Sequence, residues 1–191
     1  MKKIHLIILI LCYVSISCSK NLNNNDKSEL EALTELCTPV GYTGKDIKTV
    51  GADQRYTAGE RDSAEKCYKI AIEEDNNAKA MRMLGVIYFE DEKYDLSEQY
   101  YKMSITNGGT DALYELGKLY FTLDKYDLAE KYYKQVLDNP NFGILAKLDL
   151  GILYFKEGKY VLSKEYLSMI SGIMQDNELE QTLEKLKKMG Y

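Results

Sequence analysis

Few side-chain patterns in this chain of 191 residues could indicate a catalytic or metal-binding site. The single histidine, His5, lies near the N-terminus, in a run of apolar side chains. Histidine supplies much of the acid–base catalysis near neutral pH, the Ser-His and Cys-His nucleophiles and many metal sites. If the N-terminal segment is removed, no histidine remains. We therefore expect no such catalytic site and no bound metal or cofactor.

The other polar clusters have simpler interpretations. Glu73-Glu74-Asp75 ends an expected helix and indicates a solvated turn. Gly108-Gly109 lies between expected helices, whereas a phosphate-binding glycine loop follows a strand. Most of the 17 tyrosines recur at regular intervals, as packing residues with a polar tip do. None of these patterns indicates catalysis, so we expect that the protein is not an enzyme.

The N-terminal sequence MKKIHLIILILCYVSISCSK combines a basic start, a short apolar run and small residues before Cys18. These are the parts of a secretory signal peptide. The apolar run, Ile4 to Ile16, is shorter than the roughly 20 residues that a membrane-spanning helix needs. The segment resembles the lipobox of bacterial lipoproteins, although Ser15 stands where leucine is commonest. That resemblance implies a lipid, such as palmitate, on Cys18. An ordinary secretory signal is the alternative.

Cleavage before Cys18 would leave Cys18 to Tyr191, with 23 basic side chains facing 30 acidic ones and a net charge of −7. This acidic balance argues against nucleic-acid binding, which needs a basic footprint. We expect the protein in a bacterial cell envelope, lipid-anchored at the periplasmic face of a membrane or at the cell surface. An oxidising envelope would permit a disulfide between Cys37 and Cys67. Their spacing does not reveal whether they meet, and a free buried cysteine is the alternative.

One sequence segment recurs along the chain. Leu84–Lys102 and Leu116–Lys134 are identical at most of their aligned positions. Leu150–Ser168 is a third copy, at nearly the same spacing from the second as the second is from the first. A fainter copy begins near Arg61, where Tyr56 would match Tyr88 after deletion of one residue in the turn. Such a period indicates a packing unit that cannot bury its apolar face alone.

Each copy predicts two helices joined by a polar turn. Apolar residues of the first helix recur at steps of three and four, as in Met81, Leu84 and Tyr88. Gly85, Gly117 and Gly151 lie inside these helices, where glycine costs about 1 kcal/mol relative to alanine. We infer that a neighbouring helix comes too close at these positions for a side chain. Small residues do the same in each second helix: Ala64, Ser97, Ala129 and Ser163.

The period, the Leu-Gly pair, the tyrosine four residues after the leucine and the small residue nine after that tyrosine resemble the tetratricopeptide repeat (TPR). No tryptophan opens any copy, and only Pro140 stands near the expected closing proline. The resemblance covers about residues 45–177. It implies an all-α fold, a right-handed α-solenoid of about four TPR hairpins with an N-terminal helix and a C-terminal capping helix.

The expected organisation follows from these patterns. Ser28-Glu29-Leu30-Glu31 has the form of a capping box that opens a short helix, and Leu179, Leu183 and Leu186 share one face of a last helix. We expect these parts in order: signal peptide 1–17, flexible tether 18–27, solenoid 28–191, repeats at about 45–77, 78–109, 110–143 and 144–177, and capping helix 178–189.

TPR proteins usually bind proteins or peptides in a concave groove lined by the first helices, and the resemblance implies the same here. Phe89, Phe121 and Phe155 follow the repeat tyrosine in three copies, either to touch a partner or only to pack between repeats. The other groove positions are basic at one end and apolar at the other, which would suit a partner with an apolar stripe and acidic residues. They are Lys79, Arg82, Val86, Tyr114, Lys118, Leu145, Leu148 and Ile152.

The sequence therefore predicts a membrane-anchored envelope adaptor or scaffold, with a lipid bilayer at Cys18 and a protein partner in the groove. TPR lipoproteins of this design serve in outer-membrane protein assembly and pilus biogenesis. Two alternatives remain open. One is a surface-exposed lipoprotein that binds a host or environmental ligand. The other is an accessory or regulatory subunit of an envelope enzyme.

Overall fold

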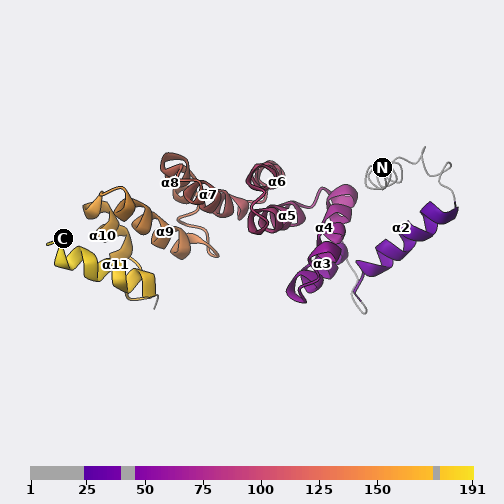
Figure 1. The fold of residues 1–191 in the computed structure, drawn as a ribbon, viewed down its shortest axis with the longest axis horizontal. Helices are drawn as coiled ribbons and strands as arrows, with labels where there is room; N and C mark the ends of the chain where they lie inside the picture. The colour runs from indigo at the N-terminus through magenta and orange to yellow at the C-terminus, as the bar shows by residue number, and fades with distance from the viewer. Residues whose placement is uncertain (1–23, 40–45, 174–176) are drawn as a thin grey trace. The chain divides into compact units, whose positions relative to one another are not determined.

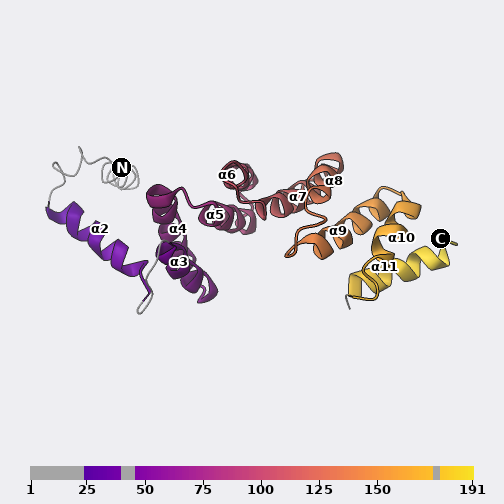
Figure 2. The ribbon, with the colours of Figure 1, turned by 180° about the vertical axis from the view of Figure 1, so that it is seen from behind.

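The computed structural model describes residues 24–39, 46–173 and 177–191. Cys18 and the expected signal peptide lie outside these residues. Within the described parts the chain forms ten helices and no strand (Figures 1 and 2). None of these helices has both the length and the apolar content needed to cross a bilayer. The helices are α2 Asn24–Leu36, α3 Ile47–Thr57, α4 Arg61–Asp75, α5 Ala78–Glu90, α6 Tyr94–Thr106, α7 Ala112–Thr122, α8 Tyr126–Lys134, α9 Gly143–Lys156, α10 Tyr160–Ser168 and α11 Asn177–Lys188.

Successive helices pack as hairpins, α3 on α4, α5 on α6, α7 on α8 and α9 on α10. The chain divides into two compact units, residues 1–109 and 110–191, and each is described by itself. In the first unit α4 also packs on α5, and in the second α8 packs on α9. The predicted all-α class and the two-helix form of each copy are confirmed.

The helical glycines lie at close approaches between the two helices of a hairpin, as the sequence predicted. A Cβ atom at Gly85 would lie 2.5 Å from Cε1 of Tyr101, and one at Gly117 would lie 2.7 Å from Cε1 of Tyr133. The Ser97 hydroxyl donates a 2.8 Å hydrogen bond to the carbonyl of Gly85, which ties the two backbones together. Both tyrosines are fully buried. These contacts leave no room for a larger residue.

The structure corrects the predicted alignment of the first hairpin with the other three copies. In three copies a tyrosine carbonyl accepts a hydrogen bond from the backbone N–H five residues later, as from Lys93 to Tyr88. In the first hairpin the matching bond runs from Glu60 to Arg55. Arg55 therefore occupies the tyrosine position and Tyr56 the phenylalanine position. The predicted one-residue deletion was wrong, because the turn has its full length and Arg55 has replaced the tyrosine that marked the register.

The turn between the two helices of each hairpin contains one residue with a positive φ. Glycine holds the position in Gly59 and Gly158, but Glu92 (φ 58°) and Asp124 (φ 55°) hold it in the middle copies. A left-handed conformation strains any residue that carries a Cβ atom. Glycine at this point ends a helix without that strain.

Replacing Glu92 by glycine should therefore raise the free energy of unfolding by about 0.5–1 kcal/mol. Gly158→Glu, at the matching position of the last hairpin, should lower it by a similar amount. Urea unfolding followed by circular dichroism measures both changes. A destabilised Glu92→Gly variant would contradict this account of the turn.

Helix α2 is fastened at its C-terminal end. A disulfide joins Cys37, just after α2, to Cys67 of α4, with Cα atoms 5.3 Å apart. The Arg55 guanidinium donates to the carbonyl of Leu36 at 2.6 and 2.9 Å, and Lys48 donates to the carbonyl of Thr34 at 3.0 Å. These donors satisfy carbonyls that a helix end leaves open. The disulfide, which the spacing alone left undecided, is present.

The start of α2 differs from the prediction. The structure begins this helix at Asn24, so Ser28 lies inside it and is not the N-cap residue of a capping box. The expected tether, residues 18–27, therefore ends in helix from Asn24 onward. Asparagine and aspartate are favoured at the start of a helix, and the run Asn24-Asn25-Asp26 extends it by one turn.

Helix α11 closes the second unit. Leu179 and Leu186 are each 1% exposed and join a cluster with Leu148, Ile152, Leu167 and Ile170. Leu183 packs against the same cluster from its edge. The predicted leucine face of the last helix is confirmed.

Candidate functional site

The first helices of the hairpins carry the predicted partner-binding residues, and we call these positions the first-helix surface. In the first unit it comprises Lys79, Arg82, Val86 and Phe89 of α5. Lys79 is exposed and pairs with Asp53 of α3 at 2.5 Å. Such an exposed ion pair contributes little to stability and can be exchanged for a partner's charge.

Asp53 also anchors a buried tyrosine. The Tyr68 hydroxyl donates to the Asp53 carboxylate at 2.6 Å. Burial, and then this carboxylate, raise the pKa of Tyr68 well above its ordinary value. Arg82 is half-buried, and its charge opposes part of that shift. The polar groups on this part of the first-helix surface are therefore linked through Asp53 and Tyr68.

The phenylalanines pack within their own hairpins. The Phe89 ring lies 5.8 Å from that of Tyr94 and Phe121 the same distance from Tyr126, while Phe155 lies 5.5 Å from Tyr160. All three phenylalanines remain only partly buried. Their packing role is present in the structure, and contact with a partner stays a prediction.

In the second unit Tyr114 is engaged inside the protein. It is 7% exposed, stacks on Phe142 at 4.8 Å and lies 5.9 Å from the ring of Tyr133. Burial, and then Asp149, raise the pKa of Tyr114. Lys118 lies over the Tyr114 ring at 5.7 Å and pairs with Glu115 at 3.5 Å. Tyr114 is thus a packing residue, whereas the Lys118 side chain stays partly exposed.

Leu148 and Ile152 lie beneath other helices. They are 7% and 8% exposed, in the cluster that α11 completes. Leu145, one turn earlier in α9, is only half-buried. While α11 is docked, Leu148 and Ile152 cannot form a large contact with a partner, and their predicted role requires α11 to leave.

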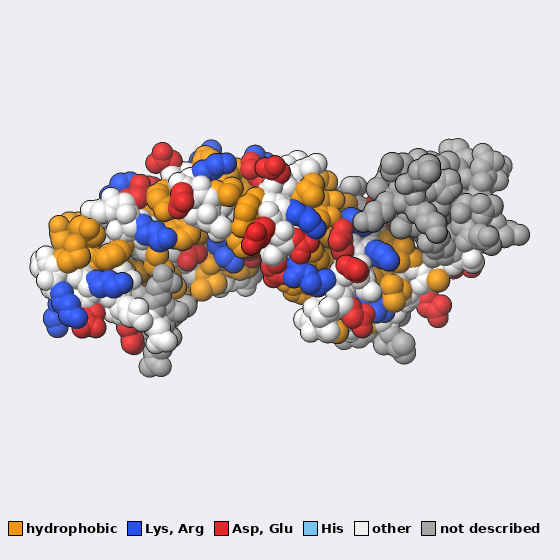
Figure 3. Space-filling model, in the orientation of Figure 1, with side chains coloured by type: hydrophobic (Ala, Val, Ile, Leu, Met, Phe, Trp, Pro, Cys, Tyr) orange, Lys and Arg blue, Asp and Glu red, His pale blue; other side chains and the backbone are white. Residues whose placement is uncertain are grey.

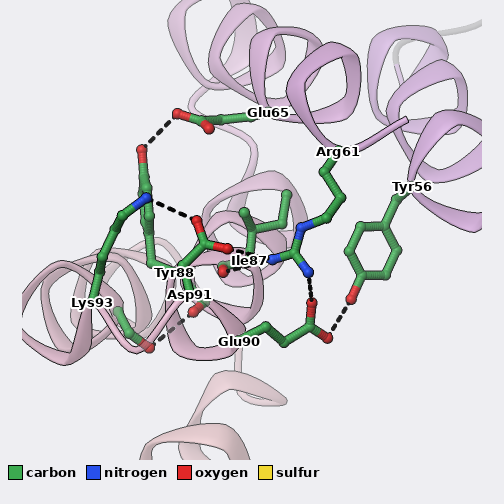
Figure 4. Close-up of polar contacts among 10 residues, drawn as sticks. Tyr56, Arg61, Glu65, Ile87, Tyr88, Glu90, Asp91 and Lys93 are labelled. Carbon is green, nitrogen blue, oxygen red and sulfur yellow. Dashed lines mark hydrogen bonds and ion pairs between the residues drawn. The ribbon is translucent and has the colours of Figure 1, made fainter. Parts of the chain in front are cut away.

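Sequence reasoning missed a polar network between the first two hairpins (Figure 4). Arg61, at the start of α4, pairs with Glu90 and Asp91 at the end of α5, each at 2.9 Å. It also donates to the carbonyl of Ile87 at 3.1 Å. The Tyr56 hydroxyl donates to Glu90 at 2.6 Å. One signal in the sequence could have predicted this network. Arg61 stands where the other copies carry Tyr94, Tyr126 and Tyr160, and the turn of the next copy is acidic.

The buried tyrosines should make the fold sensitive to alkali. Burial, first of all, raises the pKa of Tyr154 to about 12 and those of Tyr68, Tyr114 and Tyr133 further. The unfolded chain ionises near the ordinary value of 10.0. A raised folded-state pKa gives stabilisation that is complete below pH 10 and is lost as the pH rises through the folded value.

We therefore expect cooperative unfolding above pH 10, with helix content falling as the buried tyrosines ionise, after the exposed tyrosines have begun to do so. Parallel circular dichroism and ultraviolet titration measure the two signals. A gradual rise of tyrosinate absorbance, completed while helix content is unchanged, would contradict the expectation.

On the face drawn in Figure 3, basic and acidic side chains are interspersed with hydrophobic ones. No group of three or more histidine, cysteine, aspartate or glutamate side chains in the described part of the chain could hold a metal. The repeated helical hairpins define the class of the protein, an α-hairpin repeat.

Comparison with known proteins narrows that class. Residues 50–112 and 110–139 each match a tetratricopeptide-repeat family model. Residues 50–139 are therefore tetratricopeptide repeats, as the sequence predicted. Proteins of this fold are typically non-catalytic interaction scaffolds.

Solved structures share the fold at low sequence identity. PilF of Pseudomonas aeruginosa is 20% identical, with a TM-score of 0.69 over 97% of this chain and 82% of PilF. A TPR protein of Parabacteroides merdae is 22% identical, with a TM-score of 0.63 over 86% of this chain and 68% of its own. YrrB, a TPR protein with an unusual peptide-binding site, is 17% identical, with a TM-score of 0.56 over 84% and 91%. The predicted helical solenoid class is confirmed by these likenesses. No curated protein matches the chain.

Proposed function

We propose that this protein is a lipid-anchored adaptor of a bacterial cell envelope that binds a protein partner on its first-helix surface. The strongest support is that first helices in each unit keep partly exposed side chains beside their buried packing residues, Arg82 and Val86 in the first unit and Lys118 and Leu145 in the second. YrrB binds a peptide on a fold of this kind, which favours a peptide or protein segment as the ligand.

The anchor is proposed from the sequence. Cys18 follows a basic start and a short apolar run, and lipidation there would confine the protein to a membrane surface. Confinement raises the effective concentration of the adaptor for a membrane-bound partner without any new contact. Cys18→Ser should move the protein from the membrane fraction to the soluble fraction of fractionated cells. Equal membrane retention of both forms would refute the lipid anchor.

The binding surface has its own test. Substituting Tyr114, Leu148 or Ile152 would damage packing, so we choose Arg82→Glu, Val86→Glu and Lys118→Glu instead. The matched control is Lys102→Glu, an exposed position on the second helix α6. Crosslinking in cells followed by mass spectrometry should recover a protein partner with the wild-type chain and the control, and at least tenfold less with the surface variants.

Unchanged recovery from folded surface variants would exclude this surface. Removal of the protein by protease treatment of intact cells would favour a surface-exposed ligand-binding lipoprotein. A recovered enzyme whose activity changes on addition of this protein would favour an accessory subunit.

A further inference from the structure

The two terminal helices are held in different ways. Helix α2 is followed by Cys37, which is covalently joined to Cys67, and Arg55 and Lys48 bind its last carbonyls. No cysteine follows Cys67 in the sequence, so α11 has no covalent fastening. Its buried contacts are mainly leucine side chains. The N-terminal cap is therefore locked, and the C-terminal cap is held by exchangeable contacts.

The surface under α11, which we call the α11 seat, belongs to the predicted binding surface. Leu148 and Ile152 of α9 form its floor, and Phe121 and Phe155 pack at its edge. Lys156 lies over the Phe121 ring at 4.9 Å, and Lys185 of α11 over the Phe155 ring at 5.9 Å. The seat is thus apolar along its length and bordered by the basic side chain of Lys156.

The chemistry of an occupant can be read from α11 itself. Leu179, Leu183 and Leu186, at steps of four and three, present one apolar stripe to the seat, and α11 also carries the exposed Glu180 and Glu184. A helix of this length is marginal in water on its own. The helical state of α11 therefore depends on docking, and its release costs less than unfolding of the hairpins.

We propose that α11 is a displaceable occupant of its seat and that an amphipathic helix of a protein partner replaces it. That helix carries bulky apolar residues at positions i, i+4 and i+7 and acidic residues on one flank, opposite Lys156. Displacement uncovers Leu148 and Ile152, so α11 restrains binding until a helix that fits better arrives. This deepens the proposed function and rests on it only for the existence of a partner.

The test uses the full chain and a labelled peptide of residues 177–191 as the probe. A competitor inside the protein lowers the apparent affinity by the fraction of open seats. Leu186→Ala weakens the internal competitor, and we expect it to bind the peptide at least tenfold more tightly than the wild type. Lys187→Ala, an exposed substitution in the same turn, should match the wild type. A peptide with alanine at both Leu179 and Leu186 should not bind.

Equal peptide affinity for wild type and Leu186→Ala would overturn the proposal. Hydrogen exchange of the unmodified wild-type chain gives a second measurement, independent of any variant. Amides of α11 should exchange at least tenfold faster than those of α9, and equal protection would overturn the proposal. A stable dimer that exchanges α11 between two copies would also overturn it, in favour of a second copy as the occupant. Because the probe comes from this chain, failure here leaves partner binding at Arg82 and Val86 untouched.

Discussion

Removing the disulfide between Cys37 and Cys67 should lower the free energy of unfolding by about 3–4 kcal/mol. The two residues are 30 positions apart, and a crosslink closing a loop of that size restricts the unfolded chain by about this amount. Both cysteines are fully buried, so Cys37→Ala with Cys67→Ala removes the bond without leaving an unpaired polar group. Denaturant unfolding of the double variant and the wild type measures the difference.

A reductant provides the matched control. It should lower the stability of the wild type by a similar amount and leave the double variant unchanged. Peptide mapping without reduction should also recover the Cys37 peptide joined to the Cys67 peptide. A wild-type protein that unfolds at the same denaturant concentration with and without reductant would contradict the assigned role of the bond.

Adding one methyl group at Gly85 should lower the free energy of unfolding by about 2–3 kcal/mol. Alanine is favoured over glycine in a helix by about 1 kcal/mol, so propensity alone predicts the opposite sign. The new Cβ atom would meet the ring of Tyr101, which is 1% exposed and has no space to move into. Overpacking of this kind outweighs the helix-propensity gain.

Gly172→Ala is the matched control, because a Cβ atom there has nothing within 4 Å. Its free energy of unfolding should change by less than about 0.5 kcal/mol, the usual range for surface substitutions. Thermal and urea unfolding of both variants test the pair. A Gly85→Ala variant as stable as the wild type would show that the hairpin can open at this point without cost.

The later hairpins were predictable because they repeat. Leu84, Gly85 and Tyr88 recur at nearly constant spacing, and each has a packing reason that holds in every copy. Gly85 and Gly117 also predicted the close approach of the two helices. Glycine lowers the stability of a helix, so its presence there indicates that a larger side chain would clash. In these copies the local sequence pattern and the tertiary contacts agree, so the pattern was sufficient to predict the hairpins.

The first hairpin was harder, because it packs on α2 as well as on the next hairpin. Gly51 stands where later copies have leucine, and a Cβ atom there would lie 2.7 Å from the backbone carbon of Cys37. Arg55 stands where they have tyrosine, because it binds the Leu36 carbonyl. These contacts join segments that are distant in the chain, and the repeat pattern carries no information about them.

The sequence predicted which helices carry the residues of the binding surface, but not how far these residues are exposed to solvent. Repeat spacing placed Tyr114, Leu148 and Ile152 on first helices, where the structure has them. Their burial depends on Phe142 and on α11, and the repeat spacing does not specify either contact. Lys79 was likewise placed on the surface, but its pairing with Asp53 depended on the first-hairpin register that the sequence left in error.

The fastening of α2 also sets the route of mechanical load through the chain. Tension applied at the N-terminal end would pass from Cys37 through the disulfide into Cys67, so the covalent path would bypass the chain between these two cysteines. Helix α3, which lies between the two cysteines in the chain, would then take up force only through its non-covalent contacts with α2 and α4. A chain held to a surface by its first residues would thus be gripped at α4, inside the first hairpin.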